Sequence, residues 1–388
     1  MKKLTLNAFR IKNFKAVKDS RAIKFTPLTV FIGNNGSGKS SIIEGMETIQ
    51  SIVLYGLDDA MMPWKGLEYI AYQKAFKRDG RSGKILSLKN PIRFYLRGYG
   101  IEGPYKAWME ISSGAGMNDI FIQREEFISE KAECTRDETG RAVFKIFNES
   151  SKLREKLILD KGDSILEQIQ YGSVPDWQFL TLIPQFMGAP NPQRRATQNI
   201  KLEKDGSNIA EYLFHLRNRD LAAFEGIIET LQYIIPYARD LQTSITSELD
   251  RNVYLQMTES DFKIPGWLLS TGTLRLVAIL ALLRHPEPPP LIVIEEIENG
   301  LDPRTINLLV EEIRNAVESG RTQIIMTTHS PYLLDLLHIS QIVLAERDES
   351  NEPIFTRPAD REELQEWAKT FTPGKLYTMN QMGRRLKK

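Results

Sequence analysis

One segment constrains this chain more than any other: Gly33-Asn34-Asn35-Gly36-Ser37-Gly38-Lys39-Ser40, which fits the pattern G-x-x-x-x-G-K-[ST]. The apolar run 28–32 before it is typical of a buried strand, and residues 41–47 after it are typical of a helix. Glycine allows backbone N–H groups to turn toward phosphate oxygens, and the helix N-terminus adds a partial positive charge. A glycine-rich turn without a ligand is the alternative, but the flanking strand and helix make it the weaker one. The segment predicts a site for a nucleoside triphosphate.

The residues of this loop have distinct expected roles. Lys39 is expected to reach the β- and γ-phosphates, and the Ser40 hydroxyl is expected to bind Mg²⁺. The residues expected to contact the nucleotide are Asn34, Asn35, Gly36, Ser37, Gly38, Lys39, Ser40 and Ser41. The sequence therefore predicts Mg²⁺ as a cofactor beside the triphosphate.

Composition and charge exclude several classes of protein. Of 388 residues, 41% are hydrophobic and 26% charged, as in globular proteins of one large or two average domains. The net charge of +1 gives no global field that would draw the chain to nucleic acid or lipid. Cys134 is the only cysteine, which excludes an internal disulfide and a thiolate zinc site. The longest apolar run, residues 276–283, is too short to span a bilayer, so we expect a cytoplasmic protein.

Two short basic segments leave nucleic-acid binding open. Arg194 and Arg195 lie in a loop expected over residues 184–199, and the segment 383–388 is basic. For residues 383–388 a solvated tail is favoured over a contact with nucleic acid. For Arg194 and Arg195 both interpretations stay open.

The remaining pattern predicts an α/β fold with a mixed central sheet, an antiparallel β insert and a helical lobe. Strands are expected at 4–14, 22–25, 92–99, 105–112, 120–128, 142–147, 240–249, 252–258, 291–295, 322–327 and 341–345. Helices are expected at 151–170, with a break at Gly162, and at 207–217, 220–234, 272–284, 303–319 and 332–337. In the last part of the chain strands alternate with helices, which is typical of a parallel sheet with ligands at the carboxyl ends of its strands.

Two acids end the apolar strand at 291–294. Glu295 is expected to bind Mg²⁺, directly or through water, and Glu296 is expected to position and deprotonate the attacking water. Acids also end many strands at protein surfaces, but a phosphate loop in the same chain favours the catalytic interpretation.

Two further motifs are weak when each is taken alone. The segment Leu269-Ser270-Thr271-Gly272-Thr273 places a serine and a glycine at a helix N-terminus, which binds anions but is also an ordinary cap. His329 follows an apolar strand, and a loop histidine without a catalytic role is the simpler interpretation.

Taken together and in this order, the motifs resemble those of ATP-binding cassette (ABC) ATPases. The closest resemblance is to the RecF, structural-maintenance-of-chromosomes (SMC) and OLD-type group of AAA family ATPases. The segments that carry it are the phosphate loop, Phe9-Arg10-Ile11-Lys12-Asn13-Phe14-Lys15, Leu202-Glu203-Lys204-Asp205-Gly206-Ser207-Asn208-Ile209-Ala210, Leu269 to Thr273, the acid pair, Asn299-Gly300-Leu301-Asp302 and His329. The resemblance implies one ATPase head over residues 1–388, with an N-terminal lobe at 1–150, a helical insert at 151–235 and a C-terminal lobe at 236–388.

The resemblance also implies roles for single residues. Ser270 and Gly272 correspond to the signature that caps the γ-phosphate of ATP held by another subunit. Asp302 corresponds to the D-loop acid across the dimer, and His329 to the switch histidine that contacts the γ-phosphate. For the Q-loop glutamine, Gln185 is the first choice and Gln123 the second.

The sequence departs from the related families in several ways. Glu295 stands where transporter cassettes have aspartate, and Ile297 stands where they have proline; neither change alters much chemistry. The Leu-Ser-Thr-Gly-Thr signature and the antiparallel insert disfavour the engine of a membrane transporter. The sequence has no heptad repeat long enough for a coiled-coil arm, so no such arm is expected. The residues after 345 lack the acid cluster of a two-metal nuclease (TOPRIM) domain, so nuclease activity is not expected.

The function that the resemblance implies is a switch that binds and hydrolyses ATP with Mg²⁺ and dimerises over two ATP molecules. Such ATPases often control a separately encoded effector, including nucleases, in antiphage defence or DNA maintenance. The expected partners are a second copy of the chain, or a higher homo-oligomer, and an effector protein, without a membrane. The alternative is an ATP-dependent scaffold with little turnover that assembles a complex with a partner.

Overall fold

The computed structural model describes residues 5–80, 85–100, 103–114, 119–148, 151–169, 174–194, 200–247 and 250–383. The chain folds into two compact units that are each discontinuous in sequence. Unit 1 comprises Met1–Trp177, Ile339–Phe371 and Met379–Lys388, and unit 2 comprises Gln178–His338 and Thr372–Thr378. Both units mix helices and strands, which confirms the predicted α/β class.

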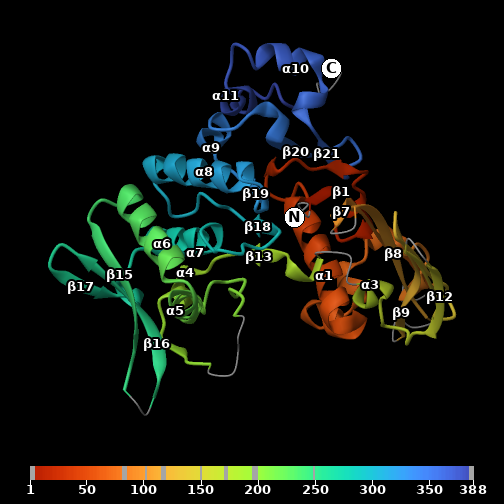
Figure 1. Cartoon of the computed structure of the whole chain (residues 1–388). Helices are drawn as coiled ribbons and strands as arrows, with labels where there is room; N and C mark the ends of the chain where they lie inside the picture. Colours follow the sequence, from red (N-terminus) through yellow and green to blue (C-terminus); the bar gives the residue numbers. More distant parts are fainter. Residues whose placement is uncertain are drawn as a thin grey trace. The chain divides into compact units, whose positions relative to one another are not determined.

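Unit 1 contains a long antiparallel sheet. Its strands are β1 (Thr5–Phe14), β2 (Val17–Asp19), β3 (Ile23–Lys24), β7 (Ile92–Gly100), β8 (Gly103–Ser113), β9 (Ile120–Ser129), β10 (Ala132–Arg136), β11 (Arg141–Asn148) and β12 (Ser151–Ile158). Among the described residues they lie in the order β12-β11-β10-β9-β8-β7-β1-β2, with β3 paired to β1 (Figure 1). Alternate side chains of β7, such as Phe94 and Leu96, are buried, because successive residues of a strand point to opposite faces. The strands expected at 92–99, 105–112, 120–128 and 142–147 are therefore confirmed.

One sequence prediction in this unit is wrong. Residues 151–158 were expected to open a helix, but they form β12, which pairs antiparallel with β11 over its whole length. Apolar residues at 153, 157 and 158 suit either a helix or a strand. The strand forms because β11 offers backbone hydrogen-bond partners along the whole segment. Helical structure follows only as α3 (Ile165–Gln168). The strand β10 was missed because it is short and carries charged residues.

The phosphate loop of unit 1 is set between a buried strand and a long helix. The strand β4 (Leu28–Ile32), which is buried along its whole length, runs parallel to β20 (Ile342–Arg347). The strand β20 in turn pairs antiparallel with β21 (Pro353–Thr356). The helix α1 (Lys39–Met61) follows the loop, bends at Gly56 (φ 82°) and packs against β1 and β9 (Figure 1).

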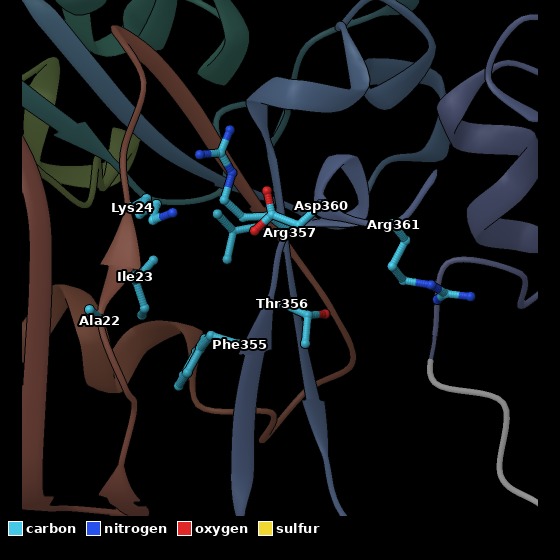
Figure 2. A pocket seen from close by; sticks show the side chains of 9 residues that line it. Ala22, Ile23, Lys24, Phe355, Thr356, Arg357, Asp360 and Arg361 are labelled. Atoms are coloured by element: carbon cyan, nitrogen blue, oxygen red, sulfur yellow. The ribbon is translucent and has the colours of Figure 1, made fainter. Parts of the chain in front are cut away.

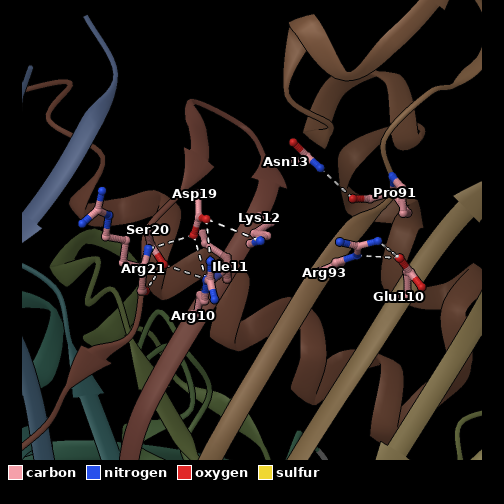
Figure 3. A network of polar contacts seen from close by, with 10 residues as sticks. All are labelled: Arg10, Ile11, Lys12, Asn13, Asp19, Ser20, Arg21, Pro91, Arg93 and Glu110. Carbon is pink, nitrogen blue, oxygen red and sulfur yellow. Dashed lines mark hydrogen bonds and ion pairs between the residues drawn. The ribbon is translucent and has the colours of Figure 1, made fainter. Parts of the chain in front are cut away.

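A polar network fixes the turn between β1 and β2. Arg10 donates two hydrogen bonds to the Asp19 carboxylate, at 2.8 and 2.6 Å, and the Lys12 ammonium lies 3.5 Å from it (Figure 3). The backbone N–H of Ile11 donates to the Ser20 hydroxyl at 3.0 Å. Two-point arginine–carboxylate contact fixes geometry as well as adding energy, so this network holds the register of the hairpin.

Unit 2 is built on three parallel strands among its described residues: β13 (Gln178–Leu180), β18 (Leu291–Ile294) and β19 (Gln323–Thr328). All residues of these strands are buried, as expected for a parallel sheet covered on both faces. The helices that accompany them are α7 (Thr271–Leu283), α8 (Pro303–Glu318) and α9 (Pro331–Asp335). These elements confirm the expected alternation of strands and helices.

A smaller antiparallel sheet completes unit 2. It contains β14 (Asn191–Pro192), β15 (Ala238–Ile245), β16 (Asn252–Glu259) and β17 (Phe262–Pro265). The helices α5 (Ile209–Arg219) and α6 (Leu221–Ile234) pack against β16 and β15, respectively (Figure 1). The expected loop at 184–199 contains α4 (Pro184–Met187) and β14, and residues 195–199 lie outside the described residues.

The other named elements are short: α2 (Leu67–Ile70), β5 (Phe76–Arg78), β6 (Ile85–Leu88), α10 (Glu362–Trp367) and α11 (Pro373–Thr378). Within the described part of the chain, no helix has both the length and the apolar composition needed to cross a bilayer.

The antiparallel sheet of unit 1 carries a buried carboxylate with a raised pKa. Glu125 on β9 is 2% exposed and accepts hydrogen bonds from the Ser164 hydroxyl at 2.6 Å and the Ile165 N–H at 2.9 Å. Burial raises the pKa of Glu125 from 4.5 to about 7, against the opposing effects of these hydrogen bonds and of the Arg136 charge. The native state therefore holds this proton more tightly than the unfolded state does.

We expect Glu125→Gln to flatten the dependence of stability on pH. In the natural chain the native state binds more protons between about pH 4.5 and 7, so stability falls as pH rises through that range and then levels off. The glutamine variant should lose that slope, an effect of about 1–3 kcal/mol. Urea unfolding followed by circular dichroism between pH 5 and 8 measures it. The exposed Glu130→Gln is the control, and an identical slope in Glu125→Gln would contradict the assignment.

Candidate nucleotide site

The phosphate loop of unit 1 requires glycine at specific positions. Gly33, Gly36 and Gly38 have φ angles of 155°, 75° and 97°, values that L side chains rarely adopt. A side chain at Gly33 would collide with the Ala345 carbonyl of β20, and one at Gly38 would lie 2.9 Å from the Pro353 side chain. The β20–β21 hairpin thus packs so closely on the loop that only glycine fits.

The polar groups of the loop fit a triphosphate with Mg²⁺. Lys39 is 7% exposed, and its ammonium donates to the carbonyls of Gly33 at 2.7 Å and Asn34 at 3.2 Å. The Ser37 hydroxyl is buried and has no hydrogen-bond partner among the described residues. Ser40 is exposed in the first turn of α1. A buried cation, an unpartnered hydroxyl and a helix N-terminus suit a phosphate, because they supply the donors that phosphate oxygens require.

Arg347 braces the same loop, and sequence reasoning missed it. Its Nε donates to the Gly36 carbonyl at 2.9 Å, and its Nη1 donates to the Asn351 carbonyl at 2.7 Å. The guanidinium thereby ties the apex of the loop to the β20–β21 turn. The sequence shows only an arginine at the end of a strand, so no local signal pointed to this contact.

A separate cavity of about 370 Å³ in unit 1 is not the candidate phosphate site (Figure 2). It lies beside Val343 of β20 and Thr356 of β21, whereas the phosphate loop contacts Ala345, Arg347 and Pro353 of the same two strands. The Phe355 side chain borders both. The Arg357 guanidinium at this cavity donates to the Ser340 carbonyl at 2.5 Å.

In unit 2 the predicted acid pair lies at the carboxyl end of β18. The Glu295 carboxylate accepts a hydrogen bond of 3.0 Å from the Thr181 hydroxyl, which follows β13. Glu296 has a φ of 49°, a conformation that costs about 1–3 kcal/mol in a residue other than glycine. Its backbone N–H donates to the Thr327 hydroxyl at 2.9 Å, which holds the strained residue in place.

The structure brings Glu296 and His329 together within unit 2. One Glu296 carboxylate oxygen lies 4.0 Å from the His329 Nε2, and the other accepts a hydrogen bond of 2.5 Å from the Asn299 side chain. The two side chains are 50% and 37% exposed, respectively. A carboxylate beside an imidazole at a solvent-accessible strand end can position a water molecule and accept its proton.

The signature and D-loop residues have structural roles that need no nucleotide. Ser270 caps α7, since its hydroxyl accepts from the Thr273 N–H at 3.1 Å. A side chain at Gly272 would collide with the Gly300 carbonyl. Asp302 caps α8 by accepting from the Thr305 N–H at 3.1 Å.

These caps also border a shared hollow. Ser270, Gly272 and Asp302 line a cavity of about 250 Å³, together with Tyr237 and Arg304. The signature and D-loop residues therefore lie side by side within unit 2.

The Q-loop assignment remains a prediction. Gln185 is exposed in the first turn of α4, after β13, the strand whose end also carries Thr181. Gln123 lies within β9 of the antiparallel sheet in unit 1. The basic residues Arg195 and 384–388 lie outside the described residues.

Among the described residues, no group of three or more His, Cys, Asp or Glu side chains is arranged to hold a metal ion. Mg²⁺ is commonly bound by one or two protein groups together with substrate phosphates, and the exposed Ser40 hydroxyl in the first turn of α1 suits such a site. Glu295, which belongs to unit 2, stays a predicted ligand.

Two family models match parts of this chain. Residues 135–335 match the family model described as "AAA domain, putative AbiEii toxin, Type IV TA system". Residues 4–53 match the model described as "AAA ATPase domain". The first match covers more than half of the chain and contains the signature, the acid pair, the D-loop and His329; the second contains the phosphate loop.

A curated relative and solved structures are also similar. The Nod factor export ATP-binding protein I of Sinorhizobium fredii is 31% identical over 117 residues, which is 30% of this chain and about a third (32%) of that protein. The crystal structure of an SMC head bound to the C-winged helix domain of ScpA has a TM-score of 0.50 at 15% identity. That similarity covers 93% of this chain and 99% of the SMC head. The SMC head of Thermotoga maritima aligns with a TM-score of 0.44 at 14% identity, over 91% of this chain and 98% of the head.

The family match and the fold lead to one assignment. The similarity at a TM-score of 0.50 covers nearly all of both chains and shows the P-loop NTPase fold of SMC heads. The expected group of RecF- and SMC-like ATPases is confirmed. The chain belongs to the AAA ATPase family described as "AAA domain, putative AbiEii toxin, Type IV TA system", with a head of the ABC, RecF/SMC-like type.

Proposed function

We propose that the protein is an ATP-hydrolysing switch that binds ATP with Mg²⁺, dimerises over two ATP molecules and controls a separate effector protein. The observation that carries the proposal is the interior of the phosphate loop. There a buried ammonium and an unpartnered serine hydroxyl lie at the start of a long helix. The ammonium donates to two loop carbonyls, but the Ser37 hydroxyl is buried without a partner among the described residues, which is costly unless a ligand supplies one. Both groups support a phosphate ligand in the loop.

The residues divide the chemistry as follows. Lys39 and the loop N–H groups bind the phosphate oxygens, and Ser40 and Glu295 hold Mg²⁺, which when bound neutralises phosphate charge. Glu296 positions the attacking water and accepts its proton, and its contact with Asn299 fixes the direction of the carboxylate. His329 donates a hydrogen bond to the γ-phosphate.

The position of the signature residues Ser270 and Gly272 supports the proposed dimer. Ser270 and Gly272 stand at the N-terminus of α7, a helix of 13 residues, and border the hollow at the D-loop. In the dimer this helix end supplies N–H donors to the γ-phosphate of ATP held by a second copy, and Asp302 lies at the same interface. Gln185 contributes as the Q-loop residue.

The description of the matched family supports control of an effector protein. Its description names a toxin of a type IV toxin–antitoxin system, which supports a role against another cellular component, in antiphage defence or DNA maintenance. The similar SMC head is bound to a domain of a second protein, ScpA, which supports partner binding by heads of this fold. A scaffold with little turnover is the second candidate, and the exposed position of Glu296 and His329 favours hydrolysis over it.

We expect Lys39→Ala to weaken ATP binding about 10- to 100-fold, because a charge-assisted contact inside the loop is lost. Isothermal titration with ATP and Mg²⁺ measures the change. Lys24→Ala, an exposed lysine on β3 of the same unit, is the matched control. Unchanged affinity in Lys39→Ala would refute the assignment of the loop.

We expect Glu296→Gln to keep ATP bound while turnover falls about 10²- to 10⁴-fold, since the base is lost but the shape of the side chain is kept. Phosphate release and nucleotide binding are measured on the same preparation. Glu311→Gln, exposed on α8, should behave like the natural chain. If Glu295→Gln stops only the chemical step while Glu296→Gln abolishes Mg²⁺ binding, the two roles are reversed.

We expect Glu296→Gln with ATP, but not with ADP, to sediment as a larger species, because unhydrolysed ATP holds two copies together. Ser270→Arg should remove this shift and the ATPase while ATP affinity stays nearly intact. Ser319→Arg, exposed after α8, is the control.

A mixing experiment tests the shared site directly. Ser270→Arg mixed with Lys39→Ala should regain part of the activity, because such a pair retains one intact composite site. A rate that is independent of protein concentration and insensitive to Ser270→Arg would rule the dimer out.

A further inference from the structure

The loop after β18 carries a third carboxylate, Glu298, that has no expected role. One of its oxygens accepts a hydrogen bond of 2.6 Å from the backbone N–H of His329. Its other oxygen is buried and has no hydrogen-bond partner among the described residues. A buried polar atom without a partner costs about 1–3 kcal/mol, so stability alone does not explain a carboxylate at this position.

The hydrogen bond of Glu298 goes to the backbone of His329 and leaves the imidazole free. The ring lies 4.0 Å from the Glu296 carboxylate, and it is 37% exposed. Fixing the backbone fixes the point from which the ring projects, because a histidine side chain has only two rotatable bonds. The bond therefore governs the distance between His329 and Glu296.

Other contacts join the same two segments. The Ile297 N–H donates to the Thr327 carbonyl at 3.4 Å, and the Glu296 N–H donates to the Thr327 hydroxyl. The Leu301 N–H donates to the Glu298 carbonyl at 3.1 Å, which keeps the loop in a tight turn. Of these contacts, only that of Glu298 reaches His329 itself.

A positive charge on the signature helix compensates the acids. Arg275 on α7 is half-buried, and this burial lowers the pKa of its guanidinium. The negative charges of Glu296 and Glu298 oppose that effect and favour the protonated form. The carboxylate that holds His329 is thus electrostatically linked to the helix that begins at Ser270.

We infer that Glu298 is a positioning residue that sets the place of His329 beside Glu296. The inference rests on the proposed ATP hydrolysis and adds a residue to it. Because Glu298 acts through the His329 backbone, its loss should affect turnover and leave ATP binding unchanged.

Three substitutions at this position test the inference. Glu298→Ala should lower kcat about 10²-fold, since misplacement of a catalytic group by about 1 Å has an effect of that size, with an unchanged dissociation constant for ATP. Glu298→Gln keeps an acceptor for the His329 N–H and should restore most of the turnover. Glu298→Met removes the buried oxygen that has no partner. Its kcat should be as low as that of Glu298→Ala, and its melting temperature should equal or exceed that of the natural chain.

The control is Glu312→Ala, which breaks a 2.6 Å ion pair with Arg284 in the same unit and does not touch His329. It should keep its kcat. Natural turnover in Glu298→Ala and Glu298→Met, or equal loss in Glu298→Gln and Glu298→Ala, would overturn the inference. Glu296→Gln, assayed in parallel, separates the hypotheses: if it too hydrolyses ATP at the natural rate, the role of Glu296 as base fails together with that of Glu298. If the natural chain hydrolyses no ATP, the proposed function itself fails.

Discussion

The shape of the phosphate loop depends on the close packing of the β20–β21 hairpin against it. The backbone of Ala345 and the side chain of Pro353 occupy the space that side chains at positions 33 and 38 would need. Arg347 adds a hydrogen bond to the Gly36 carbonyl, between residues 311 positions apart in the chain. A loop held from outside in this way keeps its conformation without ligand, and a binding site that is already ordered loses less entropy when the ligand arrives.

The proposed catalytic end of unit 2 depends on a comparable constraint. Glu296 adopts a strained backbone conformation, and such conformations persist only where the surroundings over-determine them. Here the end of β19 does so: the Thr327 hydroxyl and carbonyl accept hydrogen bonds from residues 296 and 297, and the His329 N–H donates back to Glu298. The contacts run in both directions between the segments that carry the proposed base and the switch histidine. A shift of either segment would therefore move both groups together.

Much of the fold could be predicted from the sequence because its signals are local. The phosphate loop, the strand before it and the helix after it need only neighbouring residues, as does the strand that ends at Glu295. The strand β12 could not be predicted, because its apolar spacing also suits a helix. Only the pairing with β11 selects the strand. Arg347, Thr181 and Glu298 were missed for a related reason: each acts through a contact with a distant segment, and no motif records such contacts.

The signature residues show why a structural role and a proposed binding role need not compete. Ser270 caps α7 by accepting from the Thr273 N–H, which uses a lone pair of its oxygen. The same hydroxyl also lies 2.8 Å from the Thr273 hydroxyl, and the residue is exposed. Gly272 is required by the Gly300 carbonyl, and this close approach brings the D-loop to the start of the same helix. The packing that explains these residues without a nucleotide is thus also what, in the proposed dimer, would present a helix N-terminus, with its partial positive charge, to an anion on a second copy.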